Sequence, residues 1–567
     1  MFTAISAARH GARVALMHDR PVLGGNASSE IRMWISGAGT RVRDLQETGI
    51  MEELQLENMY RNPKRNWSTW DALLYEKVRF EPNIDLILNC TCNDAKMENG
   101  KIKSVKGFQL TTYTWHEVEA KIFVDSSGDS ILAPLTGAEY RVGREAKSEH
   151  GEEFGLEVAD RHTMGMSILL QCRQTDHPVE YTPPAWAYDF PDDEAMNNKP
   201  HNIYAINTNF YWIELGGMQN SIDDTEEVRD ELLKIAFGVW DHMKNHGDHG
   251  AENWELEWVG FLPGKRESRR YVGDYVLTQH DVENCPRFDD TVAYGGWQID
   301  NHLPGGFHMN AKDGGHLQKR RLTEPYGIPF RSLYSKNIDN LMFAGRNISA
   351  THIAFSTTRV MGTCGVMGQA VGTAVSVAIK NGMLPREVGQ KKISEIQQIL
   401  MEDDCWLPGM RREISRACRQ AQLVCQGQDK ENLRNGVDRP TDEAGDNGCY
   451  VPLGTDVTYL LAEPTFVERL RIVFDSDLDR DTLTGGIPEI RDCPTVCNRP
   501  MHMPGYTFPA TMTRGFVVLA DGEEIFHTQE NYRRLVRIPV ERQVHSLTLR
   551  PLTTWGSETA HIFSLDF

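Results

Sequence analysis

The segment ARHGARVALMHDRPVLGGNASSEIR, residues 8–32, indicates the fold class of this 567-residue chain. Small and apolar residues from Ile5 to Ala8 fall on one face of a helix. Gly11 supplies a stop of the kind that commonly ends a helix. The apolar run from Val14 to Met17 then fits a buried parallel strand. The sequence therefore predicts a helix, a tight turn and a parallel strand, in that order.

This order matches the later part of a dinucleotide-binding βαβ unit. In such a unit the first strand ends in a GxGxxG loop, whose glycines let the backbone approach a pyrophosphate at a helix N-terminus. Ala4, Ala8, Gly11 and Val14 match the pattern downstream of that loop, and its third glycine would fall one position before Met1. We therefore expect a nucleotide-binding domain without its first strand and phosphate loop. A misassigned start, a truncated chain or real divergence would each give this pattern.

Charge and cysteine content bear on partners and location. The chain has 60 Lys and Arg residues against 80 Asp and Glu residues, a formal charge of -20. A protein this acidic, with no basic run, disfavours a phosphate backbone, so we expect no nucleic-acid partner.

The 11 cysteines are scattered and odd in number, which is typical of reduced intracellular thiols. We expect a cytoplasmic location, although an incomplete start would hide any signal peptide.

The longest segment without a charge, residues 360–379, is long enough to raise the question of a membrane span. Its many glycines, together with Thr363, Gln369 and Thr373, favour a helix buried inside a folded protein, because polar groups are costly in lipid. We therefore expect no membrane partner.

Apolar periodicity divides the chain into regions of different character. Residues 44–80 have helical spacing, whereas 83–92 and 101–110 fit strands joined by a turn. From about residue 160 the aromatics and short alternating segments indicate an antiparallel sheet with inserted helices, the clearest at 224–246. The expected parts are a nucleotide-binding domain, first part, 1–158; a substrate domain, 159–330; the closing part of the nucleotide-binding domain, 331–385; a helix and linker, 386–447; and a β-sandwich, 448–567.

Four motifs occur in order along the chain. They are the opening segment 8–32, IFVDSSGDSILAPLTGAEYRVGRE at 122–145, GKRESRRYVGDYVLT at 264–278, and NIDNLMFAGRNISATHIAFSTTRVMGTCGVMGQAVG at 337–372. Together they resemble the bacterial FAD-dependent oxidoreductases of the FAD_oxidored type, which are related at fold level to the fumarate reductase and glutathione reductase flavoproteins. The resemblance implies FAD as cofactor. It also implies an α/β fold, with an FAD-binding Rossmann-like domain of the two-dinucleotide-binding type and an inserted antiparallel substrate domain.

The resemblance places cofactor-binding residues at strand ends and glycine loops. In VDSSGD, Gly128 would let the backbone pack against FAD, although an ordinary Asp-capped turn gives the same motif. Arg346 suits the diphosphate because its planar fork binds two oxygens. The helix that begins near Gly362 could face the flavin N1 and C2 carbonyl, although close helix packing also explains its glycines. The expected cofactor-binding residues are Asp19, Gly24, Gly25, Asn26, Ser28, Arg32, Asp125, Gly128, Asp129, Gly345, Arg346, Gly362 and Gln369.

One position departs from the βαβ pattern. An acidic residue usually binds the ribose hydroxyls at the end of the second strand. This chain has His18 there, followed by Asp19. Either Asp19 binds the ribose, or adenosine is held differently.

Candidate catalytic residues lie in the later motifs. GKRESRR gathers Arg266 and Arg269 around Glu267, which could clamp a carboxylate or orient a polyol, whereas a salt-bridge cluster is the alternative. His352 precedes Arg359 beside the flavin segment and is the candidate general base, because imidazole titrates near neutral pH. A purely structural His352 is the alternative. We take His352, Arg359, Arg266 and Arg269 as candidate catalytic residues.

The expected reaction is hydride transfer between flavin and a small organic hydroxyl substrate, for which a sugar derivative is one class. The electron acceptor or donor is left open. One alternative is a flavin-dependent reductase of a carbonyl or double bond. Another is a non-catalytic remnant that acts as a glycan-binding or scaffold protein.

We expect no metal site. Residues 475–486 resemble a calcium loop, but Arg480 replaces its turn glycine and Gly486 its bidentate Glu. Cys493 and Cys497 are too far apart for a zinc-binding CxxC pair. From about residue 430, ENLRNGVDRP and ERLRIVFDSDL are similar to discoidin or galactose-binding-like modules. This resemblance implies a glycan or another partner at a surface of the last domain, although many such modules are only structural.

Overall fold

The predicted helix, turn and strand form as α1 (Phe2–Arg9) and β1 (Val14–Met17), and β1 pairs in parallel with β2 (Ile84–Ile87). A second parallel pair joins β6 (Phe123–Asp125) to β18 (Leu341–Phe343). Parallel strands need a crossover connection. Here the crossover between β6 and β18 is the long intervening segment that contains the predicted substrate domain.

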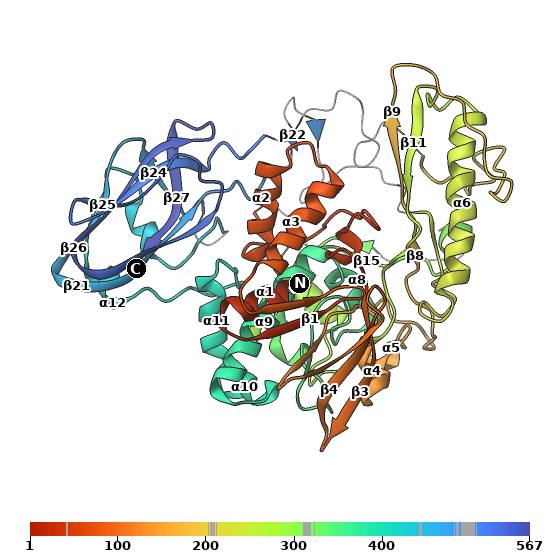
Figure 1. The fold of residues 1–567 in the computed structure, drawn as a ribbon, viewed down its shortest axis with the longest axis horizontal. Coiled ribbons are helices and arrows are strands. Elements are labelled where there is room, and N and C mark those ends of the chain that lie inside the picture. Colours follow the sequence, from red (N-terminus) through yellow and green to blue (C-terminus); the bar gives the residue numbers. More distant parts are fainter. Residues whose placement is uncertain are drawn as a thin grey trace.

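The computed structural model describes all residues except 41–43, 202, 204–209, 211, 310–318, 323, 442–444, 481, 484–486, 489–504 and 506. Cys493 and Cys497 lie outside the described residues. Figure 1 shows the α/β region in the centre, the region of α6 (Thr225–Asn245) on one flank and a β-rich C-terminal domain on the other. We call this last region the β-domain.

The uncharged segment forms α9 (Met361–Asn381), which confirms the predicted buried helix. It is long and apolar enough to cross a membrane, yet 89% of its most apolar window is buried inside the protein. Gly372 faces α1 closely, since a Cβ there would lie 2.4 Å from the Thr3 carbonyl oxygen. The other elements that pack on α9 are α2 (Ile50–Arg61), α10 (Pro385–Lys391), α11 (Ile393–Glu402) and β14 (Thr291–Gly295).

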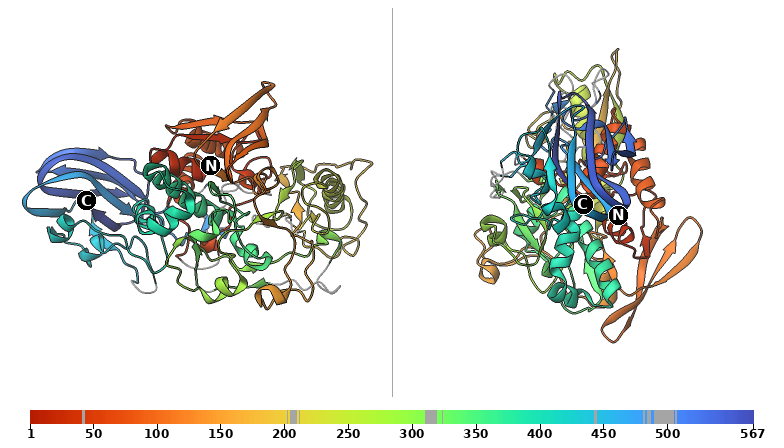
Figure 2. Two further views of the ribbon diagram at one scale, coloured as in Figure 1. Left: turned by 90° about the horizontal axis from the view of Figure 1, so that it is seen from below. Right: turned by 90° about the vertical axis from the view of Figure 1, so that its left-hand side faces the viewer.

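The helical segment predicted at 44–80 consists of two helices, α2 and α3 (Trp67–Arg79). Pro63 follows the end of α2, and the Asn66 side chain caps α3 by accepting a hydrogen bond from Thr69 N. The strand predicted at 83–92 is divided between β2, in the parallel pair, and the start of β3 (Cys90–Glu98). The strand predicted at 101–110 is confirmed as β4 (Lys101–Gln109), which forms an antiparallel sheet with β3 and β5 (Thr114–Glu119). Figure 2 shows this sheet projecting from the α/β region.

The flank opposite the β-domain is built on antiparallel pairs. Its strands are β8 (Met166–Ser167), β9 (Leu170–Gln174), β10 (Glu214–Leu215), β11 (Trp254–Val259) and β12 (Gly264–Lys265), in the orders β10-β8-β12 and β11-β9. The helix predicted at 224–246 is confirmed as α6, and its buried face packs with these strands in one apolar core. Other short elements of the chain up to residue 360 are α4 (Leu132–Thr136), β7 (Tyr140–Arg141), α5 (Lys147–His150), β13 (Arg270–Tyr271), α7 (Gln279–Asn284), β15 (Ile299–Asp300), β16 (Lys319–Arg320), β17 (Tyr326–Pro329) and α8 (His352–Thr358).

The β-domain is an antiparallel sheet with its own apolar core. Its strands run in the order β20 (Cys449–Pro452), β27 (Thr559–Asp566), β21 (Val457–Phe474), β26 (Leu535–Thr554), β24 (Thr513–Ala520) and β25 (Glu523–Thr528). The short helix α12 (Arg416–Gln420) precedes β19 (Gln422–Val424), which pairs with β21 from within the expected linker. A separate short pair is formed by β22 (Thr482–Leu483) and β23 (Ile487–Pro488).

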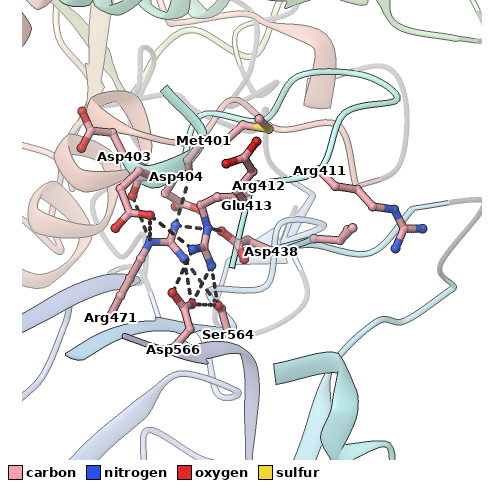
Figure 3. A network of polar contacts seen from close by, with 12 residues as sticks. Met401, Asp403, Asp404, Arg411, Arg412, Glu413, Asp438, Arg471, Ser564 and Asp566 are labelled. Atoms are coloured by element: carbon pink, nitrogen blue, oxygen red, sulfur yellow. Dashed lines mark hydrogen bonds and ion pairs between the residues drawn. The ribbon is translucent and has the colours of Figure 1, made fainter. Parts of the chain in front are cut away.

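A buried network of charges joins α11 to the β-domain (Figure 3). Arg412 donates to both carboxylate oxygens of Asp566, at 2.8 and 2.6 Å. Arg471 donates to Asp438 at 2.7 Å and to the Met401 carbonyl at 3.2 Å. Because unpaired buried charges are costly, these contacts fix the β-domain against the end of α11.

The contact between α1 and α9 can be tested with two glycines of α9. Gly372→Ala should lower the free energy of unfolding by about 1–3 kcal/mol, because its Cβ would overlap backbone. Gly365→Ala is the matched control, since its Cβ meets the flexible end of Met51, and Ala gains up to about 1 kcal/mol in a helix. Urea unfolding of both variants checks this. Equal changes in the two variants would contradict the close contact.

Candidate functional site

The carboxyl ends of β6 and β18 lie side by side, which brings together the motifs around Asp125 and Gly345. In open α/β sheets, ligands bind at this edge. Asp125 itself is saturated by protein groups: it accepts bonds from Ser127 N at 2.9 Å, Leu132 N at 3.0 Å and the Tyr271 hydroxyl at 2.6 Å. Asp125 therefore shapes the turn, as in the capping alternative, rather than offering free oxygens to a ligand.

Asp129 and Arg346 form the charged centre of this edge. Arg346 Nη2 lies 2.8 Å from Asp129, and Lys265 Nζ lies 3.0 Å from the same carboxylate. Burial opposes ionisation of Asp129, but Arg346 and Lys265 hold its pKa below the ordinary value. Gly128 has φ 77°, and a Cβ there would lie 2.5 Å from the Arg346 guanidinium. Gly128 is therefore required for Arg346 to reach its place.

The glycine loop after β1 contains three of the expected residues. Gly24 has φ 108°, and a Cβ there would lie 2.7 Å from Leu74. Gly25 has φ 58°, is exposed, and has no atom within 4 Å of the position that a Cβ would take, so a ligand can approach it. Asn26 donates to the Lys265 carbonyl at 3.1 Å, which links the loop to the Asp129 cluster. Ser28 is buried and donates to the Gly25 carbonyl at 2.7 Å, so it shapes the turn.

Other expected cofactor residues lie in different surroundings. Asp19 follows β1, is exposed and lies 3.6 Å from His18. Arg32 donates to the Gln171 side chain at 2.6 Å and stacks over Trp258, 4.2 Å from its ring centre. The guanidinium of Arg32 thus holds the glycine loop against β9 and β11.

Gln369 lies away from the strand ends. Its side-chain oxygen accepts a bond from Ile50 N at 2.9 Å and so caps α2. Gln369 also lines a cleft of about 710 Å³ between α11 and the β-domain. Much of that lining is ion-paired, as between Arg9 and Glu53 at 2.7 Å, so we do not assign the cofactor to this cleft.

Ser36 and Glu47 lie against the first turn of α9. Gly362 N donates to the Ser36 carbonyl at 2.8 Å, and the Glu47 carboxylate lies against Gly362. Burial raises the pKa of Glu47 to about 7. Sequence reasoning missed this carboxylate, although an acidic residue two positions before Gly49 in a glycine-rich stretch is a usable signal.

Two of the expected catalytic arginines lie in a buried charged group, which we call the arginine cluster. Arg266 lies 3.4 Å from Glu214, and Arg359 lies 3.4 Å from Asp300. His302 lies between the two carboxylates, 2.8 Å from Glu214 and 3.3 Å from Asp300. Burial opposes ionisation of Glu214, but Arg266 and His302 bring its pKa to about 2. Sequence reasoning missed Glu214, Asp300 and His302.

His352 lies at the start of α8 and is almost fully buried. Its Nδ1 is 2.9 Å from Glu267, and its Nε2 is 2.8 Å from the side-chain oxygen of Asn301. Asn301 follows Asp300, so consecutive residues contact His352 and the arginine cluster. A carboxylate that accepts from one nitrogen of an imidazole is the usual way to orient a catalytic histidine.

The segment Lys265–Arg270 connects the two groups of residues. Lys265 and Ser268 contact Asp129, whereas Arg266 and Glu267 face Glu214 and His352. Arg269 is not part of the arginine cluster. It donates to the Asp129 carbonyl at 3.4 Å and lies 5.5 Å from the ring centre of Tyr140.

Cys364 lies in the first turn of α9, and its thiol donates to the Arg359 carbonyl at 3.4 Å. Burial raises its pKa to about 12, while Arg346 and Arg359 both act in the opposite direction. Both guanidiniums therefore lie within electrostatic range of one thiol. The geometry places a dinucleotide-type edge next to a buried polar cluster.

The profile of the FAD dependent oxidoreductase family matches residues 1–400. The chain belongs to that family. The protein is an FAD-dependent oxidoreductase with FAD as its cofactor, as the motifs predicted. No curated protein sequence matches the chain.

Solved structures give weaker likenesses. The geranylgeranyl bacteriochlorophyll reductase-like protein of Thermoplasma acidophilum is 12% identical, with 71% of this chain and 80% of that chain covered and a TM-score of 0.28. The FAD-complexed glycerol-3-phosphate dehydrogenase of Bacillus halodurans is 12% identical, with 32% and 40% covered and a TM-score of 0.18. The family 32 carbohydrate-binding module of Streptococcus pneumoniae EndoD is 13% identical, with 27% and 97% covered and a TM-score of 0.19. TM-scores this low do not establish a shared fold or function, so nothing is concluded from these three structures.

The residues at and near the carboxyl ends of β6 and β18, which we call the cofactor edge, fit FAD. Gly25 has free space where a Cβ would lie, and the lack of a Cβ at Gly128 leaves room for the Arg346 guanidinium. Within the part of the chain that the structure describes, Arg346 Nε is buried without a hydrogen-bond partner. A diphosphate oxygen satisfies such a donor. Arg346, Gly345 and the Gly25–Asn26 backbone are the residues that would hold the cofactor here.

Gly128→Ala should weaken FAD binding at least about tenfold, because the new Cβ displaces the Arg346 guanidinium. Gly137→Ala is the matched control: Gly137 has φ 75°, close to that of Gly128, but open space around it. Both variants should lose similar stability, since Ala at positive φ costs roughly 1–2 kcal/mol. Fluorescence titration with FAD gives the Kd of each. Equal Kd values would exclude this role for Gly128.

Acid should destabilise the protein through Glu214. Its pKa is about 2, against an ordinary value of 4.5, so its ionised form stabilises the fold above pH 4.5. This contribution is lost as the pH falls from about 4.5 to about 2. In Glu214→Gln, unfolding free energy should therefore fall less steeply over that window, as measured by urea unfolding. The exposed Glu227→Gln control should keep the wild-type slope, and an unchanged slope in Glu214→Gln would contradict the assignment.

Proposed function

We propose that the protein uses FAD to oxidise a small hydroxyl-bearing organic substrate, with a sugar derivative as the expected class. The observation that carries the proposal is that residues 265–270 contact both the cofactor edge and the arginine cluster. One face of this segment contacts Asp129 at the cofactor edge, and the other presents Arg266 and Glu267 to the arginine cluster and His352. When bound, FAD supplies the hydride acceptor.

The arginine cluster is suited to orient oxygen atoms of the substrate. The pairs Arg266–Glu214 and Arg359–Asp300, both at 3.4 Å, are longer than a charge-assisted hydrogen bond of about 2.7–2.9 Å. Across the described part of the chain, Arg359 Nε and one oxygen of Glu214 are buried without a hydrogen-bond partner. A polyol can donate to that carboxylate oxygen and accept from that guanidinium at the same time.

His352 is suited to accept the hydroxyl proton. Glu267 accepts the bond from Nδ1–H, and Nε2 faces the side-chain oxygen of Asn301, which is also an acceptor. In the neutral ring that a base requires, Nε2 carries the lone pair, so a substrate hydroxyl must first replace the Asn301 oxygen and then transfers its proton to Nε2. Glu267 then stabilises the imidazolium that forms.

An anaerobic reduction experiment tests the proposal. The FAD-loaded protein is mixed without oxygen with separate polyols, sugars and hydroxy acids, and the visible absorbance of the flavin is followed. Bleaching by a polyol or sugar supports the proposal. No bleaching, together with turnover of a carbonyl or double-bond compound by a reduced dye, would favour the reductase alternative and overturn it.

Arg359→Lys should lower kcat/KM on the bleaching substrate by about 10- to 100-fold, because an ammonium group cannot replace the guanidinium fork. Arg269→Lys is the matched control, since Arg269 lies apart from the arginine cluster. The flavin spectrum and Kd of both variants should equal those of the wild type, which separates substrate orientation from folding. Equal losses of kcat/KM in the two variants would count against the arginine cluster.

A further inference from the structure

Four potential metal ligands meet at the outer part of the α6 region. They are Asp193, His201, His242 and His249, and each offers one ligand atom within 4.8 Å of the others. His242 lies in the last turn of α6 and is buried, whereas Asp193 and His201 precede the helix and His249 follows it. The four side chains therefore join the segment before α6 to the end of that helix and the residues after it. None of them belongs to the cofactor edge or the arginine cluster.

Each of the three imidazoles is oriented by a backbone carbonyl. His242 Nδ1 lies 2.7 Å from the Phe190 oxygen, and His201 Nδ1 lies 2.7 Å from the Lys199 oxygen. His249 Nε2 lies 3.0 Å from the His246 oxygen. A carbonyl only accepts hydrogen bonds, so these ring nitrogens carry the protons. The other nitrogen of each neutral ring is left with its lone pair, which is the arrangement seen around metal-binding histidines.

The remaining nitrogens converge on the Asp193 carboxylate. Asp193 Oδ1 lies 3.2 Å from His242 Nε2 and 3.5 Å from His201 Nε2. The ring centres of His201 and His249 are 4.6 Å apart, and those of His242 and His249 are 4.7 Å apart. Lone pairs and a carboxylate that face one another repel, and a cation between them satisfies all four.

We propose that Asp193, His201, His242 and His249 bind one zinc ion. Three imidazoles and one carboxylate form a complete set of four ligands for tetrahedral Zn²⁺. Imidazole and carboxylate together suit zinc better than the hard cations Mg²⁺ or Ca²⁺, which take mainly oxygen ligands. A closed set of four protein ligands is typical of a structural rather than a catalytic zinc.

The ion would tie the segments on either side of α6 to the end of that helix. Asp193 is more than half exposed, so zinc can reach the site from solvent. Because the ligands come from segments 193–201 and 242–249, bound zinc stabilises the folded arrangement of this region. The stoichiometry and affinity of zinc do not depend on FAD, which separates this proposal from the proposed reaction.

Zinc content and affinity test the proposal on the full chain. After chelation and exchange into metal-free buffer, the wild type should take up one zinc per chain, as measured by elemental analysis. Competition with a chromogenic chelator gives the affinity. His249→Ala should lower that affinity at least about 100-fold. Asp193→Asn should also weaken it, and this exposed side chain can change with little risk to folding.

His246→Ala is the matched control for this site. Its imidazole lies beside Asp189 and Asp241 instead, and the substitution keeps the His246 carbonyl that orients His249. This variant should bind zinc like the wild type. Cobalt in place of zinc should give the visible bands of a tetrahedral site in the wild type and not in Asp193→Asn. No zinc uptake by the wild type, equal uptake by the ligand variants, or loss only in His246→Ala would each overturn the proposal.

Discussion

The buried guanidinium of Arg270 fixes where the distant parts of this chain meet. Arg270 is fully buried and donates to Glu145 at 2.7 Å, to the Gly143 carbonyl at 2.8 Å and to the Ala350 carbonyl at 3.0 Å. It also donates to Glu267. A guanidinium cannot be deprotonated, so every donor must find a protein acceptor when water is excluded. The positions of these three segments are therefore coupled.

This coupling sets the direction of the neighbouring side chains. With Arg270 fixed, the preceding residues run between the Asp129 carboxylate and His352. Lys265 and Ser268 then contact the cofactor edge, while Arg266 and Glu267 face the other way. The parallel pairing of β6 with β18 holds the cofactor edge itself. One buried cation and one strand pair thus determine the distance between the cofactor residues and the arginine cluster.

Local signals in the sequence predicted several of the main helices and strands. The strand at Val14–Met17, the helix at 224–246 and the buried helix α9 follow from periodicity and composition, which are local properties. The convergence of Asp129 with Arg346 was also predictable, because parallel strands end at the same edge of a sheet. His352 and Arg359 follow β18 in the chain, whereas Arg266 is brought near them by the segment between β12 and β13.

The remaining features of the site depend on contacts between residues that are far apart in the sequence. Asp125, Arg32 and Gln369 matched the family pattern, but Tyr271, Gln171 and the start of α2 occupy their polar atoms. Nothing near these residues in the sequence identifies such partners. His201, His242 and His249 likewise have no zinc-type spacing, because the fold of the α6 region brings them together. In the sequence, Glu214 follows the aromatic run NFYWI at 209–213, and a carboxylate within an apolar run is a signal that sequence reasoning can use.

The charge balance of the buried site bears on the choice of substrate. Apart from the two imidazoles, four cations face four carboxylates: Arg266, Arg270, Lys319 and Arg359 against Glu145, Glu214, Glu267 and Asp300. A neutral polyol enters without disturbing this balance. A carboxylate substrate adds a negative charge to a buried site, and the imidazolium form of His302, which lies between Glu214 and Asp300, is a cation that would offset it. The same balance gives little long-range attraction for anions in a chain of charge -20, so recognition depends on short hydrogen bonds inside the site. On the proposed function, the charge of His302 therefore separates the two substrate classes, because a hydroxy acid needs the imidazolium as its partner and an uncharged polyol does not.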